Sequence, residues 1–168
     1  MTVDLVPIDA VAFRALEAGD TTTAESLLGV SVPDGLDVPV ETWTYMLTLL
    51  ADDPAHAPWL TNAVVVDGVV VGNAGFKGRP DGGQVELGYS IVPARRRRGL
   101  ASAAVGLLLD RARREPDVDR VVARIAPGND ASIGVVAKAG FVPDGEHVSP
   151  RNGRQLQYAV ETPGSGRL

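Results

Sequence analysis

The segment best suited to chemistry is residues 91–101, IVPARRRRGLA, which joins the end of an expected strand to the start of an expected amphipathic helix. The first turn of a helix presents N–H groups without intrahelical partners and the positive end of the helix dipole. Gly99 lets the backbone approach a ligand closely, and Ala101 adds little side-chain bulk. The segment therefore predicts an anion site of the kind that holds a phosphate.

Four consecutive arginines at positions 95–98 add positive charge to this junction. One interpretation is a solvated basic patch, but a helix dipole disfavours cations beside a helix N-terminus. That conflict favours a functional interpretation, in which the arginines meet a bound anion.

Glu86 lies in the expected strand that leads into the junction. Because side chains alternate between the faces of a strand, Glu86, Gly88 and Ser90 share one face, and the larger apolar residues share the other. The small residues leave room for a substrate beside a carboxylate that can accept a proton. The alternative is that Glu86 faces solvent or serves as an ion-pair partner.

Two sequence elements carry a resemblance to a known family. Arg96-Arg97-Arg98-Gly99-Leu100-Ala101, preceded by Val92-Pro93, fits the signature Arg/Gln-x-x-Gly-x-Gly/Ala of the GNAT superfamily of N-acetyltransferases. About thirty residues on, Asn129-x-x-Ser132 is followed by Lys138-Ala139-Gly140-Phe141. The two elements in this order are more specific than either alone. Residues 62–145 thus resemble the superfamily well, and residues 1–60 only in helical character.

The resemblance implies an α/β (α+β) fold with a mixed, mainly antiparallel central sheet of six to seven strands flanked by helices. In that family the sheet splays between strands four and five, and acetyl-coenzyme A (acetyl-CoA) is wedged into the gap. The strand end pairs with the pantetheine arm, and the amides of the following loop hold the pyrophosphate. The cofactor-binding positions carried over to this sequence are Ile91, Val92, Arg96, Arg97, Arg98, Gly99, Leu100, Ala101, Ser102, Asn129 and Ser132.

The same resemblance implies acetyl transfer to a primary amine by direct attack, with Glu86 and Ser132 as the catalytic candidates. The amine must lose a proton before it attacks, and family members often carry a carboxylate at the Glu86 position for this task. In many relatives a tyrosine four residues after the Ser132 position protonates the departing thiolate, but here that position is Val136. The remaining possibilities for protonation of the thiolate are solvent, Ser132 or no protein acid at all. Capping of the next helix explains Asn129 and Ser132 as well as cofactor contact does.

Two shorter segments, Glu86-Leu87-Gly88-Tyr89 and Gly75-Phe76-Lys77-Gly78, resemble the branch that includes the ribosomal-protein N-terminal alanine acetyltransferases. Many members of that branch have unassigned substrates. The acceptor, whether a protein N-terminus, an aminoglycoside, a polyamine or another metabolite amine, therefore stays open.

Aromatic residues are few, and Trp43, Tyr45 and Trp59 could line an acceptor pocket, although core packing explains them more simply. His56 and His147 are far apart in a chain without cysteine, so we expect no metal centre, no disulfide and no thiolate nucleophile.

Net charge and hydropathy argue against two further classes of protein, those that bind nucleic acid non-specifically and those that enter a membrane. A net charge of −5 argues against non-specific nucleic-acid binding, which depends on many cationic contacts. No apolar run is long enough to span a membrane and the first residues lack the pattern of a signal peptide, so we expect a cytoplasmic protein without a membrane partner.

Two rival hypotheses stay open: a catalytically silent acyl-CoA sensor or interaction module, and an RNA-contacting arginine patch. The oligomeric state is also open, a homodimer included.

The 168 residues fit one domain, over residues 1–160, with 161–168 as a flexible Gly/Pro-rich tail. Apolar periodicity predicts helices in the first sixty residues, then over 100–114 and 131–139. Strands are expected within 62–92 as an antiparallel meander, and at 121–126 and 155–160.

Overall fold

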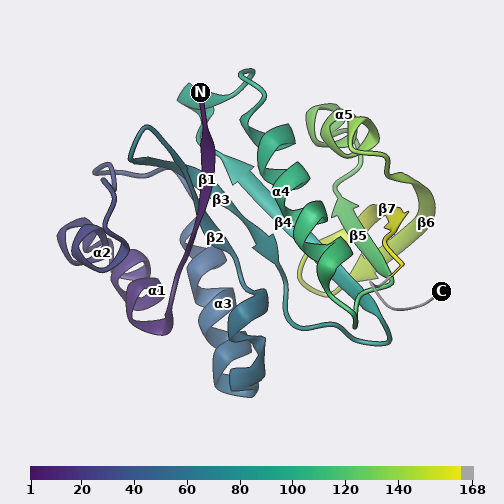
Figure 1. Ribbon diagram of the computed structural model, residues 1–168, viewed down its shortest axis with the longest axis horizontal. Coiled ribbons are helices and arrows are strands. Elements are labelled where there is room, and N and C mark those ends of the chain that lie inside the picture. Colours follow the sequence, from purple (N-terminus) through teal and green to yellow (C-terminus); the bar gives the residue numbers. More distant parts are fainter. Residues whose placement is uncertain (164–168) are drawn as a thin grey trace.

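The computed structural model describes residues 1–163 and has a seven-stranded sheet in the order β1-β2-β3-β4-β5-β7-β6 (Figure 1). Every neighbouring pair is antiparallel except β4 and β5. The strands are β1 (Val3–Pro7), β2 (Asn62–Val66), β3 (Val69–Phe76), β4 (Gln84–Ile91), β5 (Arg120–Ile125), β6 (Val142–Ser149) and β7 (Gly153–Glu161). The helices are α1 (Ala10–Glu17), α2 (Thr21–Leu28), α3 (Val40–Asp52), α4 (Leu100–Arg114) and α5 (Asp130–Lys138), with 3₁₀ turns η1 (Pro54–Trp59) and η2 (Pro93–Arg95).

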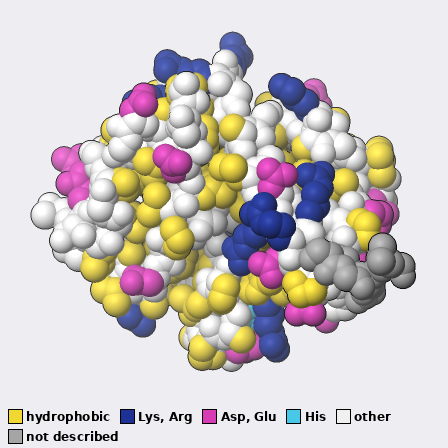
Figure 2. All heavy atoms as spheres, viewed as in Figure 1, with side chains coloured by type: hydrophobic (Ala, Val, Ile, Leu, Met, Phe, Trp, Pro, Cys, Tyr) yellow, Lys and Arg dark blue, Asp and Glu magenta, His cyan; other side chains and the backbone are white. Residues whose placement is uncertain are grey.

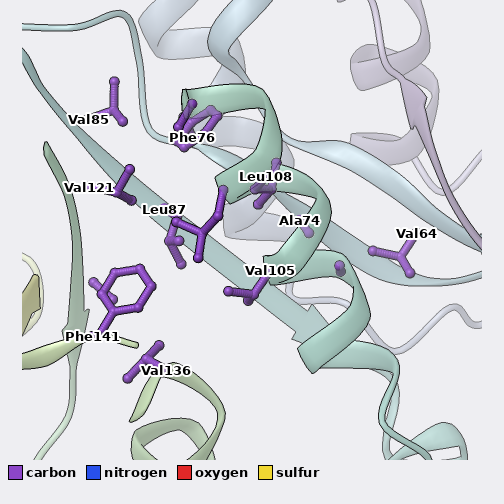
Figure 3. Close-up of a cluster of buried hydrophobic side chains, with 14 of the residues drawn as sticks. Val64, Ala74, Phe76, Val85, Leu87, Val105, Leu108, Val121, Val136 and Phe141 are labelled. Carbon is purple, nitrogen blue, oxygen red and sulfur yellow. The ribbon is translucent and has the colours of Figure 1, made fainter. Parts of the chain in front are cut away.

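The helices cover both faces of the sheet, and alternate strand residues feed two separate cores. On β2, Val64 packs with α4 and α5, while Val65 packs with α1, α2 and α3. Figure 3 shows Val105 and Leu108 of α4 in the first of these cores, which also contains Leu87. Because strand side chains alternate, each face of the sheet buries its own apolar set. The mixed sheet flanked by helices confirms the predicted fold class.

Strands β4 and β5 pair over only part of their length. The parallel register runs from Gln84↔Arg120 to Leu87↔Ala123. Beyond it, β4 stays paired with β3 as far as Ile91, and β5 stays paired with β7 as far as Ile125. The two strands therefore separate after Leu87, which confirms the predicted splay between the fourth and fifth strands.

Two strands differ from the expectations. The expectation that the first sixty residues are helical is wrong for β1, whose Leu5 pairs with Val64 of β2. β6 was not anticipated because Pro143 and Gly145 disfavour strands, and its register with β7 shifts between Pro143 and Glu146. Both strands form through pairing with distant partners, which local sequence patterns do not reveal.

The folded region also extends past the expected domain end at residue 160. Glu161 closes β7, and Thr162 is buried, with its N–H donating to Asp119 O at 2.7 Å. These two residues belong to the fold and not to the expected tail; residues 164–168 of that tail lie outside the described residues. Within residues 1–163, no helix is long and apolar enough to cross a membrane.

Gly75 of β3 packs directly against the backbone of Leu60 and Thr61, which follow η1. A Cβ atom on Gly75 would lie 2.6 Å from Leu60 O and 2.8 Å from Thr61 N. We therefore expect Gly75→Ala to reduce the free energy of unfolding by about 1–3 kcal/mol, because backbone must move to accept the methyl group. Urea denaturation measures this.

The matched control is Gly106→Ala in α4, where a Cβ atom would meet nothing within 4 Å. There alanine removes backbone entropy from the unfolded chain and should raise stability by about 0.5–1 kcal/mol. Equal stability of Gly75→Ala and the parent would contradict the close packing at Gly75.

Candidate active site

An open cleft of about 520 Å³ lies where β4 and β5 separate. Its wall includes Glu86, Gly88 and Ser90, which share one face of β4 as predicted. Leu87 and Tyr89 from the opposite face also line it. Residues of both faces contribute because the gap passes through the sheet. The remaining wall comes from α3, β3, β5, the start of α5 and the β6–β7 hairpin.

Glu86 is the centre of a charged cluster on the cleft wall. Its Oε1 accepts from Lys77 Nζ at 2.7 Å, and its Oε2 accepts from an Arg124 guanidinium nitrogen at 2.8 Å. Arg124 Nε also donates to Gln157 Oε1 at 3.0 Å, so the guanidinium is oriented from two sides. The Glu86 side chain is 17% exposed. Glu86 is thus an ion-pair partner, as one of the two interpretations expected. Each of its carboxylate oxygens keeps a second lone pair that can accept a hydrogen bond from another donor.

The junction between β4 and α4 has the features of an anion site. Gly99 precedes α4 with φ 75° and makes no side-chain cap, and the first helical bond is Ala103 N to Gly99 O at 3.0 Å. The N–H groups of residues 100–102 come before that bond. A Cβ atom on Gly99 would meet nothing within 4 Å, so the space beside it is open. Glycine is needed there for its left-handed backbone.

The four arginines at this junction differ in role. Arg96 Nε donates to Ile91 O at 2.8 Å and ties the loop to the strand end. Arg95 is half-buried, whereas Arg96, Arg97 and Arg98 are exposed, and Arg97 has φ 63°. Figure 2 shows Lys and Arg side chains at the top of the molecule, where Figure 1 places the loop between β4 and α4. Arg97 and Arg98, which are not bonded to the strand end as Arg96 is, are therefore the better candidates for direct contact with an anion.

The backbone at the end of β4 changes one expectation. Val92 N donates to Val71 O of β3 at 2.9 Å, and Val92 O accepts from Arg95 N at 2.9 Å. Val92 was expected to pair with a ligand, but its backbone groups are already engaged in this way. Because backbone groups alternate between strand edges, the N–H groups of Tyr89 and Ile91 face the gap instead. The N–H group of Tyr89, and not that of Val92, therefore points into the gap.

The start of α5 forms another part of the cleft wall. Asn129 Oδ1 accepts from Ser132 N at 3.2 Å, which confirms the capping role, and both residues line the cleft. Tyr89 OH donates to Ser132 O at 3.2 Å. Burial raises the pKa of Tyr89, so its hydroxyl stays protonated at neutral pH. Val136, in contrast, is fully buried in the core.

Tyr89 was missed as a site residue because strand alternation assigned it to the apolar face. Only the opening of the sheet after Leu87 lets a residue on that face reach the cleft. The tetrapeptide Glu86-Leu87-Gly88-Tyr89 carries the resemblance to the ribosomal-protein branch, but nothing in its sequence indicates this contact.

Of the three aromatic residues considered for an acceptor pocket, Tyr45 lines the cleft. Trp43 is buried against Phe13, with ring centroids 6.3 Å apart. Trp59 packs on Phe76 at 5.7 Å. These two tryptophans therefore pack in the hydrophobic cores and not in an acceptor pocket.

The two histidines lie in different parts of the structure. His147 is part of the cleft wall, whereas His56 Nδ1 accepts from Arg79 N at 2.9 Å. Among residues 1–163 no group of three or more His, Asp or Glu side chains is placed to hold a metal ion.

Comparison with known proteins identifies the family. A family model described as Acetyltransferase (GNAT) domain matches residues 9–142. This match covers most of the chain, which therefore belongs to the GNAT acetyltransferase family. No curated protein sequence matches it.

Solved structures with the same fold include RimJ of Mycobacterium smegmatis in complex with CoA-disulfide, with 23% identity and a TM-score of 0.66 over 95% of this chain and 81% of that one. The ribosomal-protein-alanine N-acetyltransferase of Brucella melitensis has 23% identity and a TM-score of 0.61, over 96% and 99% of the two chains. A phosphinothricin acetyltransferase of Sinorhizobium meliloti, in complex with AcCoA, has 17% identity and a TM-score of 0.64, over 100% and 93%. The ribosomal-protein acetyltransferases indicated by the sequence are thus among the proteins that share the fold.

Proposed function

We propose that this protein transfers the acetyl group of acetyl-CoA to a primary amine by direct nucleophilic attack. The observation that carries the proposal is the position of the gap between β4 and β5, which opens beside the junction that leads into α4. A ligand with a pyrophosphate and an extended amide-containing arm can use both features at once. The family match and the structural similarity to AcCoA- and CoA-bound proteins support this choice of cofactor.

The chain's own groups fit such a cofactor. The N–H groups of residues 99–102 and the exposed Arg97 and Arg98 would hold the pyrophosphate. The gap-facing N–H groups of Tyr89 and Ile91 would pair with the arm, as a neighbouring strand would. When bound, acetyl-CoA supplies the activated acetyl group as a thioester.

Proton removal from the acceptor amine falls to Glu86, directly or through one water. It is the only acidic residue on the cleft wall within the described chain. Its ion pairs with Lys77 and Arg124 fix the carboxylate in position. Ser132 and Tyr89 also line the cleft, and their hydroxyls are the candidates to donate a proton to the departing thiolate; for Tyr89 this means giving up its hydrogen bond to Ser132 O.

The second candidate function is a catalytically silent acyl-CoA-binding sensor. Two observations favour it: Val136 replaces the tyrosine of many relatives and is buried, and both oxygens of Glu86 already accept from cations. Binding of acetyl-CoA without release of CoA, across a panel of amines, would select the sensor over the enzyme.

The proposed pyrophosphate site predicts a selective effect at Gly99. A glutamate there places a negative charge in the open space beside the α4 amides, so acetyl-CoA should bind at least about tenfold more weakly to Gly99→Glu, a loss of about 1.4 kcal/mol. Isothermal calorimetry measures the affinity.

Gly29→Glu is the matched control, because Gly29 has φ 70° and open space but caps the end of α2. Both variants should lose similar stability through backbone strain, and only Gly99→Glu should lose affinity. Unchanged acetyl-CoA affinity in folded Gly99→Glu would exclude the proposed pyrophosphate site.

Glu86→Gln tests the assignment of the base. The amide keeps the size but cannot accept the proton, so turnover near pH 7 should fall about 10²–10⁴-fold while acetyl-CoA affinity holds. Raising the pH should narrow the difference, because more of the acceptor is then deprotonated in solution. CoA release as a function of pH measures this.

Lys77→Gln is the control for loss of the ion pair, since it removes one partner of Glu86 and keeps the carboxylate. Its turnover should fall much less than that of Glu86→Gln. Turnover of Glu86→Gln within about threefold of the parent at neutral pH would show that positioning, and not a side-chain base, accounts for the rate.

A further inference from the structure

The charge of the cleft wall suggests what kind of amine the site accepts. We propose that the acceptor is a small amine that also carries an anionic group, a carboxylate or a phosphate, and that Arg151 binds this group. The inference rests on the proposed acetyl transfer and deepens it. It separates anionic amines from polyamines and aminoglycosides, which carry several positive charges.

The cleft wall has more positive than negative charge. Lys77, Arg124 and Arg151 line it, and Glu86 is the only acid on the wall among residues 1–163. Since Glu86 pairs with Lys77 and Arg124, this cluster keeps an excess of one positive charge. Arg151 adds a second positive charge. The whole chain has a net charge of −5, so the positive cleft is a local feature.

Arg151 is held in a way that leaves its guanidinium accessible. It lies in the β6–β7 turn, is exposed, and its Cζ is 4.7 Å from the ring centroid of Tyr45 on α3. One nitrogen donates to the backbone carbonyl of Glu41 at 3.4 Å. Within the described chain no carboxylate lies within salt-bridge distance of Arg151. A guanidinium stacked on a ring keeps its planar fork for a bidentate anion.

Other arginines near this hairpin are already neutralised. Arg154 pairs with Glu146 through two nitrogens. Arg120 pairs with Asp144 at 2.6 Å and with Glu161 at 3.1 Å. Of the three arginines of this comparison, Arg120, Arg151 and Arg154, only Arg151 has no carboxylate partner within the described chain, and only Arg151 lines the cleft.

The surroundings of Arg151 suit an anion. Thr42, Ser149 and Asn152 line the same cleft and carry side-chain donors that can reach carboxylate or phosphate oxygens. The contact between Arg151 and Tyr45 links the hairpin to α3, so this end of the cleft is walled by both. An acceptor would then place its anionic group toward the hairpin and its amine toward Glu86.

The test uses matched acceptors that differ in one negative charge: an amino acid against its primary amide, and phosphoethanolamine against ethanolamine, with spermidine as the polycation. CoA release gives kcat and KM for each acceptor. The acceptors are compared on the concentration of their free, unprotonated amine. For the parent, kcat/KM should be at least about tenfold higher for the anionic member of at least one pair, and spermidine should be the poorest acceptor. The pair that responds distinguishes carboxylate from phosphate.

Arg151→Gln should lower kcat/KM at least about tenfold for that anionic acceptor, mainly through KM, and less than about threefold for its neutral partner. Arg154→Gln, on the same hairpin but outside the cleft, should leave both values unchanged. Equal effects of Arg151→Gln on both members of a pair, or better turnover of neutral amines or spermidine, would overturn the inference alone. So would acetyl-CoA binding with no turnover of any anionic amine. Absence of acetyl-CoA binding would instead overturn the proposed function and this inference with it.

Discussion

The incomplete pairing of β4 with β5 is the constraint on which the site depends. Each strand keeps its other neighbour, β3 for β4 and β7 for β5, so the sheet remains continuous while a gap opens after Leu87. Backbone N–H and C=O groups on the open edges then lack a strand partner, and unpaired backbone groups are costly unless water or a ligand satisfies them. The fold thus builds a site for an extended ligand with amide groups of its own.

The arrangement of charge in the cleft follows from strand register. Lys77 comes just after β3, Glu86 lies on β4 and Arg124 on β5, so one carboxylate joins three neighbouring chain segments on the same face of the sheet. Ion pairs of this kind contribute little net stability because desolvation offsets much of their attraction. Their main effect here is geometric, since they hold the carboxylate beside the gap and leave the wall with an excess of positive charge.

Much of the fold and part of the site could be predicted from the sequence, for identifiable reasons. The junction at Gly99 combines a turn glycine with the start of a helical pattern, and strand alternation placed Glu86 on the cleft face; both signals are local. The partners of Glu86, the cleft position of Tyr89 and the stacking of Arg151 on Tyr45 depend on contacts between distant segments. Strands β1 and β6 were missed for the same reason, because their pairing partners and not their own residues determine them.

Amide hydrogen exchange along β4 tests the central claim most directly, because it reports on the open strand edge itself. The amides of Tyr89 and Ile91 face the gap, whereas the amide of Val92 already donates to Val71 O. If acetyl-CoA occupies the gap, saturating cofactor should slow exchange at Tyr89 and Ile91 and at residues 100–102, while Val92 changes little. Unchanged exchange at Tyr89 and Ile91 with bound acetyl-CoA would contradict the account.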